Sequence, residues 1–140
     1  CKTAWLLSDI SDAQVKSNIY YLNEYEVDMY GACLINSNND ISILGSWGFD
    51  NSYSCSIDLW FSKGNLIAKR IFTAKNDFVA NVDLIEKNNV YKNKFIDDQY
   101  YKAVDEFYLT ILSNTKMLIH YSSNLRQSCL MEKILKNHDL

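Results

Sequence analysis

The clearest hydrophobic pattern in the chain is an alternation that runs from Tyr53 to Phe61. Apolar residues occupy every second position, and serine, aspartate and tryptophan stand between them. A period of two is typical of a β-strand that buries one face. The alternation stops at Ser-Lys-Gly-Asn, where Gly64 can supply a positive φ, and an apolar run resumes from Leu66 to Thr73. The segment is therefore predicted to be a β-hairpin.

Other segments with strand-like spacing flank this hairpin, and turns rich in Asn, Asp and Ser separate them. The segment 127–135 fits a strand and a short helix equally well. The predicted strands are 26–36, 41–47, 78–85, 90–96 and a second hairpin made of 103–112 and 117–121.

One helix is expected near the start of the chain, over residues 11–24. Capping side chains precede it, and Val15, Ile19 and Leu22 follow at helical spacing. The alternative is a strand through Asn18–Leu22, because Tyr and Ile prefer sheets.

These elements predict an α+β fold that is mainly antiparallel β. It would be a small curled sheet, barrel or sandwich of about five to seven strands, preceded by the one N-terminal helix. A chain of 140 residues can bury a respectable core, so residues 1–140 are expected to form a single domain.

Composition narrows the possible partners. The net charge is −3 and the basic residues are scattered, so there is no basic stripe for nucleic acid. No apolar stretch is long enough for a transmembrane helix. The four glycines are too dispersed to build a phosphate-binding loop.

The four cysteines bear on the compartment. They form no C-x-x-C pair, so a zinc site is not expected. The first residue, Cys1, resembles the lipid-bearing cysteine of a mature bacterial lipoprotein, and the chain has no N-glycosylation sequence. Both observations favour a bacterial envelope protein, facing the periplasm or anchored in the outer membrane, with a secreted protein as the alternative. In that setting the preferred disulfide joins Cys55 to Cys129, and Cys33 is a buried thiol or the partner of an unlipidated Cys1.

No group of residues predicts a reaction. His120 is interpreted as an outward residue of a strand, and His138 lies in the C-terminal tail. Asp105 and Glu106 would point to opposite faces of a strand, and Asp97-Asp98 lack the spacing of a calcium loop. Catalytic residues, metal ligands and cofactors are therefore not expected, and the protein is predicted not to be an enzyme.

Tyrosine is abundant, with ten residues. Outside a core, tyrosine is an amphipathic contact residue that is enriched in interfaces. A possible partner surface is therefore assigned to Tyr20, Tyr21, Tyr25, Tyr100 and Tyr101.

Gly45-Ser-Trp47, followed by an alternating strand, resembles the G-x-W signature of lipocalin-like (calycin) barrels. The resemblance implies structural core roles for Gly45 and Trp47. It also implies that Arg126 packs on the tryptophan and that Cys129 is the late bridging cysteine.

Two functions follow as hypotheses. The first is a non-catalytic cell-envelope lipoprotein that binds a protein partner or a small apolar ligand. The alternative is an immunity protein whose acidic, tyrosine-rich surface neutralises a toxin enzyme.

Overall fold

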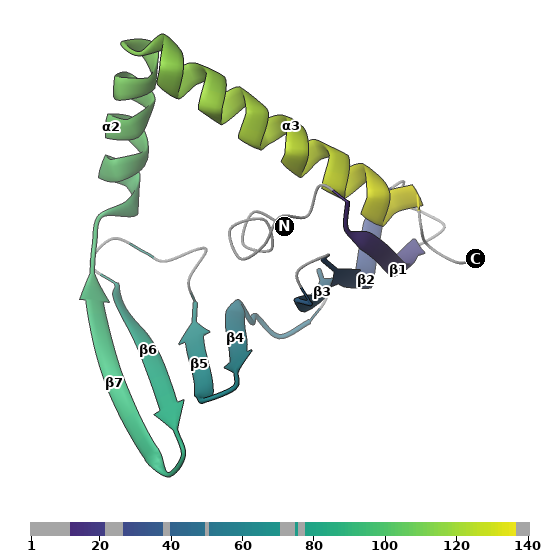
Figure 1. The fold of residues 1–140 in the computed structure, drawn as a ribbon, viewed down its shortest axis with the longest axis vertical. Helices are drawn as coiled ribbons and strands as arrows, with labels where there is room; N and C mark the ends of the chain where they lie inside the picture. Colours follow the sequence, from purple (N-terminus) through teal and green to yellow (C-terminus); the bar gives the residue numbers. More distant parts are fainter. Residues whose placement is uncertain are drawn as a thin grey trace. The chain divides into compact units, whose positions relative to one another are not determined.

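The fold is known from a computed structural model, and Figure 1 traces its elements. The chain divides into two compact units, residues 1–50 with 113–140 and residues 51–112, and each is treated by itself. The prediction of a single domain therefore stays a prediction. The structure describes residues 12–21, 27–37, 40–49, 51–70, 75 and 78–136.

The first unit contains a sheet of three antiparallel strands in the order β1-β2-β3. Val15 and Ile19 of the first strand face inward, and Ile35 of the second lies opposite Val15 in the register. One face of this sheet is thus apolar, and it must be covered. The strands are β1 (Gln14–Tyr21), β2 (Asp28–Asn36) and β3 (Ser42–Gly48).

The helix α3 (Asn114–Lys136) covers this face with its C-terminal end. Leu130 and Ile134 are each only 2% exposed and join the strand residues in one core. Figure 1 shows the yellow end of α3 lying over the purple strands of this sheet. The Ser17 hydroxyl, buried in the middle of β1, donates a hydrogen bond to the carbonyl oxygen of Ile134. This bond satisfies a polar group that would otherwise destabilise the core.

Trp47 is held in place by the backbone of the neighbouring strand. It lies directly opposite Gly31 in the register of β2 and β3. A Cβ atom on Gly31 would come within 2.2 Å of the indole ring, so the ring occupies the space that a side chain would need. The indole Nε1 donates to Asp28 Oδ2 at 2.6 Å.

The second unit contains a four-stranded antiparallel sheet in the order β4-β5-β6-β7. Two apolar rows cross it, because Ile57 faces Ala68 and Leu59 faces Leu66 in adjacent strands. Among the described residues of this unit, only Ala68 is buried. The strands are β4 (Ser56–Phe61), β5 (Gly64–Lys69), β6 (Val79–Glu86) and β7 (Asn89–Ile96).

The helix α2 (Gln99–Ile111) follows β7 in the second unit. Asp98 is its N-cap, and the side-chain Oδ1 accepts a hydrogen bond from the Tyr101 backbone N–H at 2.9 Å. An aspartate at this position satisfies one of the free N–H groups at a helix start. Asp97, just before the cap, forms an exposed ion pair with Lys102.

The coarse fold class is confirmed: the protein is α+β with antiparallel sheets. The seven described strands also agree with the predicted number. The barrel is wrong, since the described strands form two separate open sheets. None of the helices in the described ranges is both long and apolar enough to cross a membrane.

The predicted N-terminal helix over 11–24 is also wrong, because residues 14–21 form β1. The alternative strand interpretation identified the correct element. Serine at position 17 interrupts the apolar alternation, and only its distant partner on α3 makes the position suitable for a core.

The predicted hairpin of 103–112 and 117–121 is replaced by α2 and the start of α3. Val104, Tyr108 and Ile111 recur at spacings of four and three, which is a helical period. The ambiguous segment 127–135 is helical and belongs to α3.

The predicted role of Gly64 needs correction. No described glycine has a positive φ. A Cβ on Gly64 would lie 2.2 Å from the carbonyl oxygen of Ile85, so glycine is required there for the close approach of two strands.

The contact between Gly31 and Trp47 gives a first prediction. Gly31→Ala should lower the free energy of unfolding by about 1–3 kcal/mol, because the added methyl group collides with a fixed ring. Gly45→Ala should cost less, since its Cβ would meet the Cys33 sulfur at 3.1 Å. Urea unfolding measures both. In a Trp47→Ala background the effect of Gly31→Ala should largely disappear, and an undiminished effect would show that the ring is not the obstacle.

The N-cap gives a second prediction. Asp98→Ala should destabilise the protein by about 1 kcal/mol, because the Tyr101 N–H loses its acceptor. The matched control is Asp97→Ala, which removes only an exposed ion pair and should cost about half a kcal/mol or less. Urea unfolding followed by the helical circular dichroism signal measures both variants. Equal losses would argue against the capping role.

Candidate functional site

The residues predicted as structural core lie in the first unit. Trp47 is half-buried against Gly31, and Gly45 lies opposite Cys33 in the sheet. Arg126 lies on an exposed part of α3, and its packing on Trp47 stays a prediction. The hydrogen bond to Asp28 fixes the orientation of the indole, so this corner serves the packing of the sheet.

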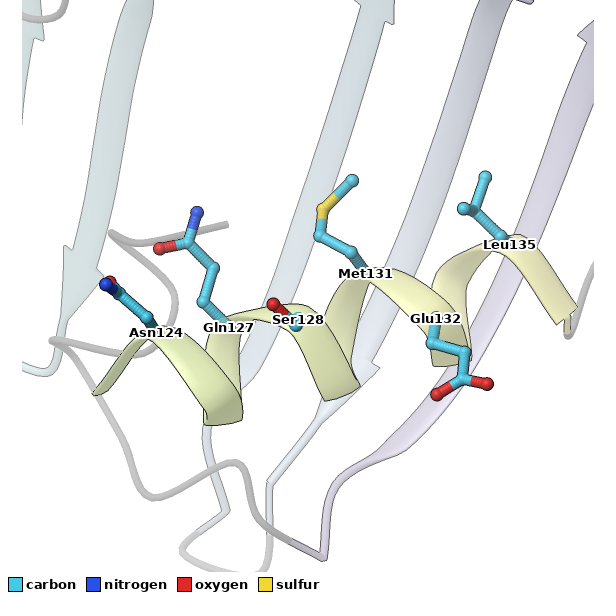
Figure 2. Close-up of a pocket in the computed structure, with 6 residues that line it drawn as sticks. All are labelled: Asn124, Gln127, Ser128, Met131, Glu132 and Leu135. Atoms are coloured by element: carbon cyan, nitrogen blue, oxygen red, sulfur yellow. The ribbon is translucent and has the colours of Figure 1, made fainter. Parts of the chain in front are cut away.

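A shallow depression of about 480 Å³ runs along α3. Its lining residues recur along α3 at spacings of one, three and four. Figure 2 shows Gln127, Met131 and Leu135 projecting from the same side, while Glu132 points the other way. The described lining residues are Asn124, Gln127, Ser128, Met131, Glu132 and Leu135.

This depression offers hydrogen-bonding groups and no acid or base that titrates near neutrality. A hydrogen bond from Lys136, reinforced by the charge of that ammonium group, lowers the pKa of the Glu132 carboxyl. Glu132 is therefore ionised at neutral pH and cannot act as a proton donor there. Amide and hydroxyl side chains can bind a polar ligand, but the arrangement contains no reactive group.

Metal and histidine chemistry receive no support from the described part of the chain. No group of three or more His, Cys, Asp or Glu in the searched ranges could hold a metal ion. His120 is half-buried on α3, so it lies on a helix and not on the strand that was predicted. His138 lies outside the described residues.

Cys33, Cys55 and Cys129 are free thiols in the structure. Burial raises the pKa of the Cys33 thiol, and a hydrogen bond with the backbone of Gly45 opposes part of that effect. Cys33 is thus an unreactive core residue. Cys55 and Cys129 belong to different units, so the bridge between them stays a prediction. Cys1 lies outside the described residues, and its lipidation is untested.

The predicted tyrosine surface falls on both units. Tyr20 and Tyr21 are exposed on β1, and the Tyr20 ring lies 6.1 Å from that of Tyr30. Tyr100 and Tyr101 are exposed on α2. Tyr25 lies outside the described residues. Exposure is what a partner surface requires, but the role itself stays a prediction.

Sequence reasoning missed Arg70, which follows β5 and has a φ of 57°. Its guanidinium contacts two aromatic rings, those of Tyr53 and Phe78. No motif marks this residue. The signal in the sequence was a lone arginine at the end of an apolar strand, close to a turn.

No protein-family model matches the chain, and no curated protein matches it in sequence. Solved structures do match. One is KijD10, a 3-ketoreductase from Actinomadura kijaniata, in complex with NADP, with a TM-score of 0.89 and 18% identity. The match covers 98% of this chain and 44% of that one. The open conformation of KijD10 with TDP-benzene and NADP gives a TM-score of 0.86 at 17% identity, with the same coverage.

At this identity the likeness establishes the fold. The chain spans less than half the length of the structures it matches.

The comparisons overturn several predictions. The lipocalin-like resemblance is wrong, because the matching fold is that of a ketoreductase and the described sheets are open. The hypotheses of a non-catalytic envelope lipoprotein and of an immunity protein are wrong for the same reason, as is the prediction that the protein is not an enzyme. The prediction of a protein partner or apolar ligand is also wrong, since the matching structures hold NADP and TDP-benzene instead. The cellular location stays untested.

The buried thiol gives a third prediction, on pH. Because the pKa of Cys33 is raised in the folded protein, its contribution to stability is complete below the pKa of the unfolded chain, about 8.5. That contribution is lost as the pH rises through the folded value. Between about pH 8.5 and the higher folded pKa, the free energy of unfolding should therefore fall more steeply in the natural protein than in Cys33→Ala.

Urea unfolding at a series of pH values measures this slope. The control is Cys129→Ala, which removes an exposed thiol and should leave the slope unchanged. Identical slopes for the natural protein and Cys33→Ala would contradict the prediction.

Proposed function

We propose that this chain is part of an NADP-dependent ketoreductase that acts on a nucleotide-linked keto sugar. The observation that carries the proposal is the likeness to KijD10, with TM-scores of 0.86 to 0.89 over 98% of the chain. The chain would provide the region of the enzyme that does not hold the dinucleotide.

The residues of this chain do not fit a dinucleotide. The sequence contains no G-x-G-x-x-G, and its four glycines are dispersed. A dinucleotide crevice forms at the carboxyl ends of parallel strands, beside a glycine-rich turn. All strand pairs in the described ranges are antiparallel. NADP would therefore be held by polypeptide outside these 140 residues.

The exposed surface of α2 supports the proposal that a further part of the enzyme holds NADP. No residue of α2 is buried, and Tyr101 and Val104 are each 69% exposed. Together with Tyr108 and Ile111 they form an apolar stripe along the helix. A helix in a globular protein is stabilised mainly by packing such a stripe. In the proposed enzyme, the dinucleotide-binding part would cover it.

Nicotinamide binding tests the proposal. The 140-residue chain alone should not alter the fluorescence of NADPH, because it lacks a site for the dinucleotide. The complete enzyme that contains this chain should bind NADPH and oxidise it when a TDP-linked 3-keto sugar is added. Loss of the nicotinamide absorbance measures the reaction.

Two controls complete the experiment. NADH in place of NADPH tests the cofactor preference, and the keto sugar without its nucleotide tests the substrate class. A complete enzyme that binds neither nicotinamide cofactor would overturn the proposal.

A further inference from the structure

We propose that Arg70 binds a phosphate group of the substrate's nucleotide portion. This inference names a ligand-binding residue within the second unit, and its choice of ligand rests on the proposed function. The argument itself depends on Arg70, whose charge has no counter-ion among the described residues and whose buried Nε has no hydrogen-bond partner.

Arg70 is fixed to the end of the four-stranded sheet. Its backbone N–H donates to the carbonyl oxygen of Cys55 at 2.5 Å, which continues the pairing of β4 and β5 by one more bond. The same end of the sheet contains the start of β6 and the end of β7, since Val79 lies opposite Ile96. Figure 1 shows α2 leaving from this end. The Arg70 side chain therefore extends from a hydrogen-bonded end of the sheet, the same end from which α2 leaves.

Two aromatic rings contact the guanidinium. Its central carbon lies 5.3 Å from the centre of the Tyr53 ring and 5.7 Å from that of Phe78. Such contacts are attractive and restrict the rotamers of a long side chain. Arginine held in this way loses less conformational entropy when it binds a ligand.

The charge of Arg70 has no counter-ion among the described residues. The two carboxylates nearest in sequence to the start of α2 are both engaged, Asp97 with Lys102 and Asp98 with the Tyr101 N–H. The Nε atom of Arg70 is buried and has no hydrogen-bond partner. A buried donor without an acceptor is unfavourable and requires an explanation. An anion beside the guanidinium would compensate the charge.

The backbone also indicates that the side chain is needed. Arg70 has a φ of 57°, a conformation that glycine adopts without strain. Among described non-glycine residues, Asp40 and Lys87 share it, and both lie between paired strands. Glycine would suit the backbone at position 70 better than arginine. The presence of arginine is therefore explained by its side chain and not by the backbone conformation.

Phosphate is the anion that best matches these features. The planar fork of a guanidinium donates two parallel hydrogen bonds to a phosphate, and charge-assisted bonds of this kind are the strong ones. A nucleotide also carries a flat base, and exposed aromatic rings such as Tyr53 can stack on it. The ligand class is therefore an organic phosphate, with a nucleoside diphosphate as its simplest form.

Calorimetric titration of the 140-residue chain tests the site, with TDP and pyrophosphate as the probes and thymidine as the uncharged comparison. The chain should bind TDP and pyrophosphate but not thymidine. Arg70→Gly should weaken binding of both anions about tenfold or more, because one charge-assisted group is lost. Arg70→Lys keeps the charge but not the fork and should retain only part of the affinity.

Lys87→Gly is the matched control. It also removes one positive charge and also relieves a positive φ, but at the turn between β6 and β7, so binding should stay unchanged. Urea unfolding of each variant separates a loss of binding from a loss of folding. If Arg70→Gly does not fold, Arg70→Lys decides.

Undiminished binding by the Arg70 variants, or no binding of TDP and pyrophosphate by the natural chain, would overturn the site. The reductase assignment is tested separately. If the complete enzyme reduces its keto sugar and Arg70→Gly leaves the KM unchanged, the site is wrong and the assignment stands. If TDP binds through Arg70 but the complete enzyme shows no NADPH-dependent activity, the site stands and the assignment is wrong.

Discussion

The first unit depends on the contact between the end of α3 and β1. Leu130 and Ile134 close the apolar face of the three-stranded sheet, and the Ser17 hydroxyl donates to the Ile134 carbonyl across 117 positions of the chain. An apolar sheet face is stabilised when it is removed from water, and the end of α3 does this here. Since the rest of α3 buries no residue, this short contact positions the whole helix. Bringing positions so far apart in the sequence together costs loop-closure entropy, which the contacts of this core must offset.

Strands with strict alternation were predictable, and β2 to β7 lie close to their expected positions. The period of two alone determines which face each residue takes, without knowledge of the partner. β1 was not predicted as a strand because Ser17 occupies a core position. A polar residue is acceptable there only when a distant acceptor is present. The prediction of a hairpin in place of α2 and the start of α3 was wrong for another reason. Val104, Phe107 and Ile111 carried a helical period, but the high content of aromatic and β-branched residues favoured strands. The capping residue Asp98 was the signal in the sequence that would have identified the helix.

The candidate site was much less predictable than the fold. Arg70 belongs to no motif, and its surroundings come from Tyr53 and Phe78, which lie 17 and 8 positions away in the sequence. Only the pairing of β4, β5 and β6 brings the three together. The resemblance of Gly45-Ser-Trp47 to a barrel signature misled for a related reason. The short motif matched, but Trp47 packs across Gly31 in an open sheet and plugs no barrel.

The lack of a reaction motif in the chain suggested a non-catalytic protein, and this step of reasoning fails in general for part of an enzyme. A reductase concentrates its recognisable sequence signals where the dinucleotide binds, because the glycine-rich turn and the helix start impose strict residue choices. In the proposed enzyme, a region that faces the substrate would need only shape and a few polar groups on a rigid sheet. Such a region resembles an ordinary packed domain in its sequence. Two features of the second unit fit such a region in the proposed enzyme: within this unit no residue of α2 is buried, and the buried Nε of Arg70 has no hydrogen-bond partner.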